Sequence, residues 1–416
     1  MVREESRNRS RRDRNRERET ERRREAAKRE KLAMMEELPR IDRALYVTMI
    51  YLCAFGLIMI MSASGGSTGL VKKQAFFIAC GAVFMYIFRE MNYNRLIIYA
   101  IPAYTVSLIL ILLLLTPLGI NVNGATRWLG YQSESFEVSF QVAEVVKICV
   151  ILMLGYLMQK FERFSSRRVL ALYLWIAGGV PAVMLLTISN DLSSALIVLM
   201  ITYGVSFVCT QTWKMHLAAF LAGAAVAVGY VRDIADHMPE PAIMKDISFR
   251  IVRIAVFLDP YRYAEDEGFQ VVQALKAIGS GGLTGKGLGN SLVRNTLPEA
   301  HTDMIFCVLC EELGLIGVFA LTALFVYLFY LLVRVTCHAD SIFGVAIGTG
   351  VLAHIACQTL VNLYVNTNML PNTGLPLPFI SYGGTSVTLL MVEMTLAVSI
   401  EKHSMLVTVK KMQRDG

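Results

Sequence analysis

Three titratable residues stand close together in the stretch LPEAHTDMIF, which opens a long apolar segment. Glu299, His301 and Asp303 lie within five residues of one another, and Pro298 fixes the entry of the chain. A carboxylate at the edge of a segment that enters lipid is costly, so such a group is by default a candidate functional residue. We therefore take all three titratable residues as candidate site residues.

The residue types leave four roles open for Asp303. Either Thr302 or Asp303 could cap the helix that the apolar run predicts, because a side-chain oxygen satisfies free N–H groups in a first turn. Asp303 could also serve as a general base, as a metal ligand or as a proton-relay group. The sequence around it does not decide among these roles.

A glycine-rich stretch upstream of Asp303 supplies a candidate cation. In FQVVQALKAIGSGGLTGKGLGNS, apolar residues at helical spacing from Phe269 predict a short amphipathic helix at the membrane surface, ending at Gly279. The glycines that follow would either let Lys286 and backbone N–H groups face an anionic headgroup or form a flexible turn. A nucleotide P-loop is rejected, because Ser280 and Gly287 stand where its template needs Gly and Ser or Thr.

Charged residues also occur in and beside other apolar segments. Glu144 and Lys147 are three residues apart on one helix face, where they would form a structural pair or part of a headgroup site. Arg250 and Arg253 align within one turn, and they would either hold a carboxylate or phosphate or anchor the segment at the membrane surface. Glu393 lies in the middle of an apolar run and has no evident partner in the sequence.

The composition predicts the elements that must position these residues. Of the 416 residues, 55% are hydrophobic and 18% are charged, and apolar runs near the length of a membrane span recur along the chain. Such runs must be helices, because a lone strand cannot satisfy its backbone in lipid. We predict an all-α polytopic membrane protein with about ten transmembrane helices. The segments are 43–62, 71–88, 95–117, 139–160, 168–188, 191–210, 215–232, 303–334, 341–366 and 377–400.

The distribution of Lys and Arg predicts the orientation of these helices. Loops on the side of the N-terminus carry most of these residues, and the opposite short loops carry few, Arg127 among them. By the positive-inside rule, both termini are cytoplasmic. Residues 233–302 then form one large extracytoplasmic loop between helices 7 and 8, and shorter outer loops cover about 118–138 and 366–377.

The two ends of the chain differ in composition from the part between them. Residues 1–43 contain 16 Lys or Arg and 11 Asp or Glu, with few apolar residues to bury. We expect residues 1–42 to be a basic cytoplasmic tail, disordered or solvated, that rests on anionic lipid rather than binding nucleic acid. The membrane domain is expected over residues 43–402, and a short cytoplasmic tail over residues 403–416.

Three stretches resemble motifs of the SEDS family, whose members include FtsW, RodA and SpoVE. They are FLDPYRYAEDEGFQVVQALKAIGSGGLTGKGLGNS, LPEAHTDMIFCVLCEELGLIG and LPLPFISYGGTS, and they occur in the family's order. The similarity covers about residues 43–400. The form LPEAHTD resembles the FtsW and SpoVE branch more than RodA.

The resemblance implies a function and a set of site residues. SEDS proteins are peptidoglycan glycosyltransferases that polymerise lipid II, an undecaprenyl-pyrophosphate-linked disaccharide pentapeptide, with inversion and release of undecaprenyl pyrophosphate. The family's essential acid matches Asp303, which would be the catalytic base. The expected substrate-binding residues are Arg127, Glu144, Lys147, Arg253, Lys286, Glu299, His301 and Ser381.

The resemblance also implies partners and a location. Family members work with a class B penicillin-binding protein, a transpeptidase that activates the polymerase, and with other division or elongation proteins. The expected location is the cytoplasmic membrane, at the septum for a division or sporulation protein. A divalent cation, Mg²⁺ or Mn²⁺, would share the stabilisation of the pyrophosphate, and no organic cofactor is expected.

Two other functions are consistent with the residues. Charges at Glu144, Lys147 and Glu393 would also suit a lipid II flippase or another transporter. A divisome scaffold without chemistry is the second alternative. A transporter needs polar groups across the whole membrane depth, whereas most of those noted here lie toward the predicted outer half.

Overall fold

The computed structural model describes residues 41–122, 125–133, 136–162, 166–241, 244, 247–297 and 300–414. All but the last two residues of the predicted N-terminal tail lie outside these ranges. The long helices are α2 (Ile41–Ala63), α3 (Thr68–Phe88), η1 (Tyr93–Tyr99) continued by α4 (Ala100–Leu113), α5 (Val142–Phe161), α6 (Arg167–Thr187), α7 (Leu192–Thr210), α8 (Trp213–Asp236), α11 (Ile305–His338), α12 (Ile342–Asn366) and α13 (Thr385–Arg414).

The predicted fold class is confirmed. In the described ranges, nine helices, with η1 and α4 counted as one, are long and apolar enough to cross a membrane. α13 is the tenth long helix; it carries Glu393, Glu401 and Lys402, which lower its hydropathy, and it packs against α3, α11 and α12. The chain is therefore a helical polytopic membrane protein with nine or ten spans.

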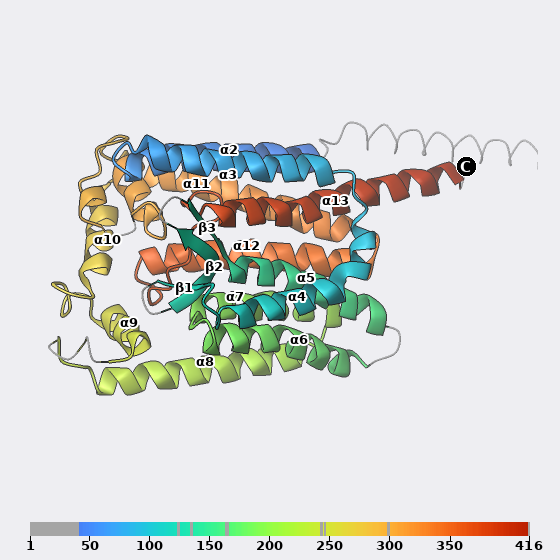
Figure 1. Ribbon diagram of the computed structural model, residues 1–416, viewed down its shortest axis with the longest axis horizontal. Helices are drawn as coiled ribbons and strands as arrows, with labels where there is room; N and C mark the ends of the chain where they lie inside the picture. The colour runs from blue at the N-terminus through green and yellow to red at the C-terminus, as the bar shows by residue number, and fades with distance from the viewer. Residues whose placement is uncertain are drawn as a thin grey trace, which may run out of the picture.

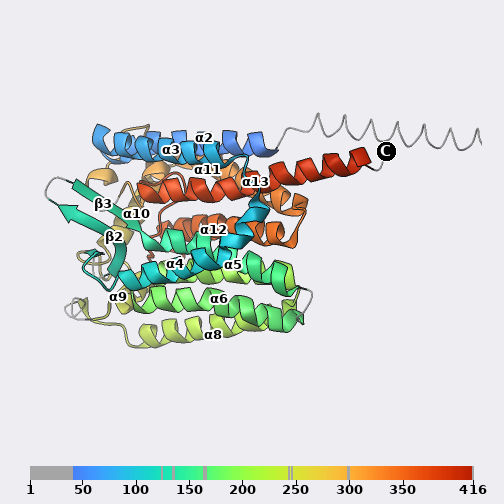
Figure 2. The ribbon, with the colours of Figure 1, turned by 45° about the vertical axis from the view of Figure 1, so that its right-hand side comes forward.

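Two of the helices form the centre of the bundle. In their most apolar stretches, 72% of the residues of α5 and 61% of those of α12 are buried, compared with 6% in α8. α12 packs against α5, α7 and α11, whereas α8 lies along the outside of the bundle (Figure 2). Polar side chains on α5 and α12 are therefore the ones most shielded from lipid.

The segments that the sequence assigns to outer loops gather at one end of the bundle (Figure 1). A three-stranded sheet lies there together with α9 (Phe249–Leu258), α10 (Phe269–Ser280) and the short η3 (Val293–Asn295). α10 is the helix predicted from Phe269, one residue longer than expected. Its place at a membrane surface and the sidedness of this end remain predictions.

The sheet is an addition to the predicted helical architecture. β1 (Gly119–Val122), β2 (Ala125–Ser133) and β3 (Phe136–Gln141) pair antiparallel in the order β1-β2-β3. Trp128 of β2 pairs with Ile120 on one side and with Gln141 on the other. The predicted fourth span began at residue 139, but residues 139–141 continue β3, and α5 begins only at Val142.

α11 is kinked near its start. Gly314 has φ 60° and ψ −158° inside the helix, a conformation that only glycine adopts without strain. A Cβ on Gly314 would lie 2.4 Å from the backbone nitrogen of Gly285, which itself has φ 76°. The glycine-rich loop therefore packs directly on the kink.

Hydrogen bonds fix this loop on α11. The N–H groups of Lys286 and Gly287 donate to the carbonyls of Glu311 and Glu312, each at 2.9 Å. The glycines allow a close backbone approach between two segments, and these two N–H groups donate within the protein rather than outward.

The predicted tenth span also begins later than expected. Residues 377–384 form an irregular segment, and α13 starts at Thr385. Pro378 cannot donate a helical hydrogen bond, and Phe379 and Gly384 have positive φ, so the segment cannot continue as a helix. At the other end, α13 continues to Arg414, through most of the predicted C-terminal tail.

Candidate active site

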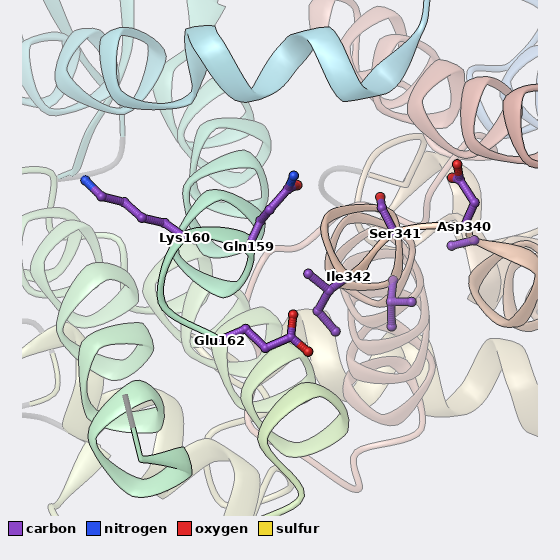
Figure 3. Close-up of a pocket in the computed structure, with 8 residues that line it drawn as sticks. Gln159, Lys160, Glu162, Asp340, Ser341 and Ile342 are labelled. Atoms are coloured by element: carbon purple, nitrogen blue, oxygen red, sulfur yellow. The ribbon is translucent and has the colours of Figure 1, made fainter. Parts of the chain in front are cut away.

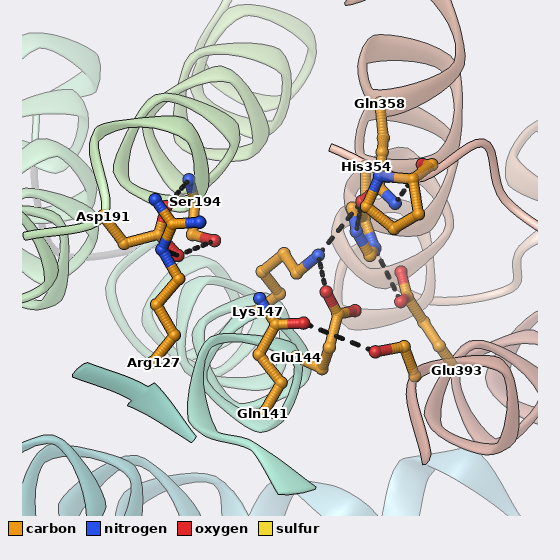
Figure 4. A network of polar contacts seen from close by, with 11 residues as sticks. Arg127, Gln141, Glu144, Lys147, Asp191, Ser194, His354, Gln358 and Glu393 are labelled. Atoms are coloured by element: carbon orange, nitrogen blue, oxygen red, sulfur yellow. Dashed lines mark hydrogen bonds and ion pairs between the residues drawn. The ribbon is translucent and has the colours of Figure 1, made fainter. Parts of the chain in front are cut away.

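Arg127 and Asp191 form a charged pair at the loop end of the bundle. Arg127 lies on β2, and its Nε is 3.7 Å from Oδ2 of Asp191, which precedes α7 (Figure 4). Asp191 caps α7 by accepting hydrogen bonds from the backbone N–H and hydroxyl of Ser194, at 3.2 and 2.7 Å. The Arg127 side chain is 25% exposed, and its buried Nε has no hydrogen-bond partner among the described residues. Arg127 therefore keeps part of its side chain exposed beside the buried carboxylate of Asp191.

Arg253 brings a second guanidinium to the same place. The pKa of Arg253 is lowered to about 10, mainly by burial and secondarily by the charge of Arg127, while Asp303, Asp191 and Glu267 act in the opposite direction. These charges are thus electrostatic neighbours, although they come from separate segments of the chain. Arg253 also lines a small cavity of about 80 Å³ between α9, α10 and the segment after α12.

The backbone of Asp303 is held by α12. Its carbonyl accepts hydrogen bonds from the side-chain amides of Asn362 and Asn366, each at 2.9 Å. Its side chain is partly exposed, and one carboxylate oxygen faces Gly374 of the loop before α13. The predicted capping role is wrong, because α11 begins at Ile305 with Met304 in the cap position. Asp303 therefore precedes the helix, on a fixed backbone.

Glu144 and Lys147 form the predicted ion pair on α5. Lys147 Nζ lies 2.7 Å from Oε1 of Glu144, and their side chains are 0% and 4% exposed. Lys147 also donates to Oε1 of Gln358 on α12, at 3.1 Å. The ammonium group is fully buried between these two side chains, and contact of Lys147 or Glu144 with a substrate stays a prediction.

Gln358 links this pair to a second one. His354 Nε2 lies 3.0 Å from Oε1 of Gln358, and His354 Nδ1 lies 2.7 Å from Oε2 of Glu393 (Figure 4). Glu393 has no evident partner in the sequence, and in the structure its partner is His354. The resulting chain of contacts joins α5, α12 and α13 in the interior of the bundle.

Lys286 lies in a separate polar cluster at the kink of α11. Its Nζ is 2.6 Å from Oε1 of Glu311, whose other oxygen accepts from the Ser291 hydroxyl at 2.5 Å and from the Val293 N–H at 3.3 Å. The neighbouring Glu312 accepts from the Ser62 hydroxyl of α2 at 2.7 and 2.6 Å. Binding of a pyrophosphate by Lys286 stays a prediction; the Lys286 side chain is 31% exposed and has donors besides the one that Glu311 accepts.

The other predicted substrate-binding residues lie in nearby loops. Ser381 is buried, and its hydroxyl accepts from the Leu377 N–H at 2.8 Å, so it shapes the segment before α13. The ring of His301 lies 5.7 Å from that of Tyr382, and its carbonyl accepts from the Tyr382 N–H at 2.9 Å. Glu299 lies outside the described residues.

Sequence reasoning missed several members of these clusters. Glu311 and Glu312 stand as two consecutive acids inside an apolar run, which is itself a signal of an internal polar site. His354 and Gln358 precede Asn362 and Asn366 at a constant spacing of four, which places all of them on one helix face.

A larger cleft, of about 750 Å³, lies at the opposite end of the bundle. It is lined by the end of α5 and the start of α12, with Lys160, Glu162, Asp340 and Ser341 among its residues (Figure 3). None of the predicted site residues lies there. Within the described ranges, no three His, Cys, Asp or Glu side chains are grouped as a metal site.

The architecture and the polar groups at its loop end define a class of protein: a polytopic helical membrane protein with an acid–arginine site where the helices meet the loops. Residues 43–406 match the cell cycle protein family of FtsW, RodA and SpoVE. The chain belongs to this SEDS family, as the sequence motifs predict.

Curated relatives match the sequence of this chain over most of their length. Stage V sporulation protein E of Bacillus subtilis (strain 168) is 29% identical over 374 residues, which cover 87% of this chain and 97% of that protein. The probable peptidoglycan glycosyltransferase FtsW of Thioalkalivibrio sp. (strain K90mix) is 34% identical over 387 residues, covering 88% and 90%. Both names fall in the branch that the sequence favours.

Solved structures share the fold. A chain of a peptidoglycan synthase complex, from work on the structural coordination of polymerization and crosslinking, matches with a TM-score of 0.69 at 25% identity, covering 87% of this chain and 97% of that one. The rod shape determining protein RodA of Thermus thermophilus matches with a TM-score of 0.61 at 24% identity, covering 88% and 98%, and this likeness concerns the fold alone.

Proposed function

We propose that the chain is a peptidoglycan glycosyltransferase that polymerises lipid II at the outer face of the cytoplasmic membrane, for septal wall synthesis. The observation that carries the proposal is that Arg127 with Asp191, Arg253 and Asp303 all lie beside the loop before α13, at the loop end of the bundle, where their charges influence one another. An acid and two guanidinium groups are what proton transfer and a departing pyrophosphate require. The curated FtsW relatives, named probable peptidoglycan glycosyltransferases, support the activity.

Asp303 is the proposed general base. Its carboxylate takes the proton from the 4-hydroxyl of the acceptor sugar as that oxygen bonds to the anomeric carbon of the donor. The bond from that carbon to the pyrophosphate breaks, so the configuration inverts and undecaprenyl pyrophosphate leaves. The hydrogen bonds from the side-chain amides of Asn362 and Asn366 to the Asp303 carbonyl hold the backbone of the base in place during this step.

Arg127 and Arg253 are the proposed contacts of the pyrophosphate. Guanidinium groups suit this task because they remain charged and present parallel donors to phosphate oxygens. The buried Lys147 acts on the site through Gln358, which binds the Pro376 carbonyl in the segment beside Asp303. A divalent cation would supply further positive charge beside the pyrophosphate, and the Asp303 carboxylate is the protein group that could hold it.

The proposed partner is a class B penicillin-binding protein. Support comes from the similar chain in the peptidoglycan synthase complex, which links polymerization with crosslinking. Other division or elongation proteins would bring the pair to the septum.

The test is polymerisation of lipid II by the purified full chain with its transpeptidase partner in detergent, with and without a chelator. Detergent removes the two sides of a membrane, so glycan strands in this assay require chemistry rather than transport. We expect strands from the complex. Absence of product from folded complex, together with lipid II movement across vesicles, would favour the flippase. Normal division of cells that carry only Asp303→Asn would favour the scaffold.

A further inference from the structure

One face of α12 carries a polar side chain at every fourth position. His354, Gln358, Asn362 and Asn366 are each at most 1% exposed. A spacing of four keeps side chains on one face of a helix, so the set forms a stripe from the middle of α12 to its loop end. Its last two members already bind the backbone of Asp303.

The orientation of the Gln358 amide follows from its partners. Its Nε2 donates to the carbonyl of Pro376 at 3.0 Å, and a proline carbonyl can only accept. Its Oε1 therefore faces both Lys147 Nζ and His354 Nε2, at 3.1 and 3.0 Å, and both of these must donate. Nε2 of His354 thus carries a hydrogen.

The contact between His354 and Glu393 then holds one further proton. Nδ1 and Oε2 are 2.7 Å apart, so the pair is either imidazolium with carboxylate or imidazole with carboxylic acid. The pair has no net charge in either form. Oε1 of Glu393 is buried without a hydrogen-bond partner among the described residues.

Stability alone gives little reason for this pair. Apolar residues of similar volume usually replace a buried ion pair with no loss of stability, or with a gain. The contacts indicate a different role. The contact of Nδ1 with Glu393 keeps the hydrogen on Nε2 of His354, which donates to Gln358, and Gln358 also contacts Lys147 and the carbonyl of Pro376.

We infer that His354 and Glu393 are positioning residues for the proposed polymerase site. Through Gln358 they orient Lys147 on one side and the Leu375–Pro376 segment on the other. Asn362 binds the Leu375 carbonyl at 2.8 Å and the Asp303 carbonyl at 2.9 Å, so this segment and the proposed base share one support. The inference rests on the proposed function and adds two residues to its machinery.

The test uses the full chain with its transpeptidase partner and lipid II as the substrate. In the double variant His354→Leu/Glu393→Leu, the pair is replaced by apolar side chains, and we expect a folded complex with an unchanged melting temperature. Because Gln358 loses one of its two donors and is held less firmly, kcat should fall by about 10- to 100-fold, while KM stays within about twofold.

Glu393→Gln is the conservative variant that should rescue activity. Its amide N–H can donate to Nδ1 of His354, so Nε2 still donates to Gln358. We expect kcat within about threefold of wild type, a recovery of most of the loss seen in the double variant. A similar fall in Glu393→Gln and in the double variant would contradict the inference.

His216→Leu is the matched control. His216, at the start of α8, is also fully buried, and its Nε2 forms a hydrogen bond with the Ser206 hydroxyl at 2.9 Å. Ser206 lies near the end of α7 that is remote from the site. Its loss should lower the melting temperature and leave kcat unchanged.

Two outcomes would overturn the inference in different ways. Wild-type kcat and KM in the folded double variant would show that the pair only fills space. If the double variant does not fold, wild-type kcat in Glu393→Met would show the same. No glycan from the folded wild-type complex would overturn the proposed function itself, and the inference with it.

Discussion

Two of the lysine–glutamate pairs among the described residues have nearly equal lengths but very different surroundings. Lys147 and Glu144 are 2.7 Å apart on α5 in the centre of the bundle, with side chains 0% and 4% exposed. Lys286 and Glu311 are 2.6 Å apart where the glycine-rich loop meets the kink of α11, and Lys286 is 31% exposed. One pair is local in sequence, and the other joins residues 25 positions apart.

The further bonds of each pair separate their roles. Glu311 of α11 also accepts hydrogen bonds from the Ser291 hydroxyl and the Val293 N–H, which follow the glycine-rich loop. Glu311 therefore holds that part of the chain on α11. Lys147 instead bonds to Gln358, which leads to His354 and to the segment beside Asp303. We therefore assign the Lys286–Glu311 pair to holding the loop and the Lys147–Glu144 pair to supporting the site.

The largest effect on stability should come from Lys147→Met. The change leaves the carboxylate of Glu144 buried without its counter-charge, which typically costs about 3–5 kcal/mol. We expect a strong fall in the melting temperature of the purified protein together with loss of polymerisation. An unchanged melting temperature would contradict the buried pairing.

Lys286→Met should have a smaller effect. Glu311 keeps its bonds from Ser291 and Val293, and a lost hydrogen bond to a charged group costs about 1.5–3 kcal/mol. The glycine-rich loop should loosen, which faster amide exchange at Lys286 and Gly287 would report. If polymerisation fell while amide exchange stayed unchanged, Lys286 would be a ligand of the substrate, as the sequence predicted.

The double variant Glu144→Leu/Lys147→Leu should have the smallest effect on stability. Removing both charges leaves nothing unpaired, and such replacements are often neutral. The melting temperature should therefore stay close to that of wild type, yet polymerisation should fall at least about tenfold, because Gln358 loses its ammonium partner. Wild-type activity of this double variant would show that the Glu144–Lys147 pair contributes to packing only and does not support the site.

Much of the helical architecture could be predicted from the sequence, because lipid demands long apolar helices. The pairing of Glu144 with Lys147 was also predictable, since both lie within one turn. α10 was predicted for the same reason, from the local spacing of its apolar residues. These features depend on neighbours in the chain.

The missed features depend on contacts between distant segments. His354 and Glu393 are 39 residues apart, and Asp303 lies about 60 residues before the two asparagines that hold its carbonyl. The sheet had a local signal in the sequence, because Phe136, Val138 and Phe140 alternate with polar residues. The predicted fourth span nevertheless included the end of β3, because the residues that follow are apolar. Spacing can suggest a polar face on α12, but it cannot name the partner on another helix.

The most direct test of the account is the rate of lipid II polymerisation by the Asp303→Asn complex. Asn keeps the size of the side chain and removes the base, so we expect a fall in kcat of about 10²- to 10⁴-fold with an unchanged melting temperature. Asp233→Asn is the matched control, because Asp233 is an exposed acid near the loop end of α8 and should leave the rate unchanged. A wild-type rate in Asp303→Asn would contradict the assignment of Asp303 as the base.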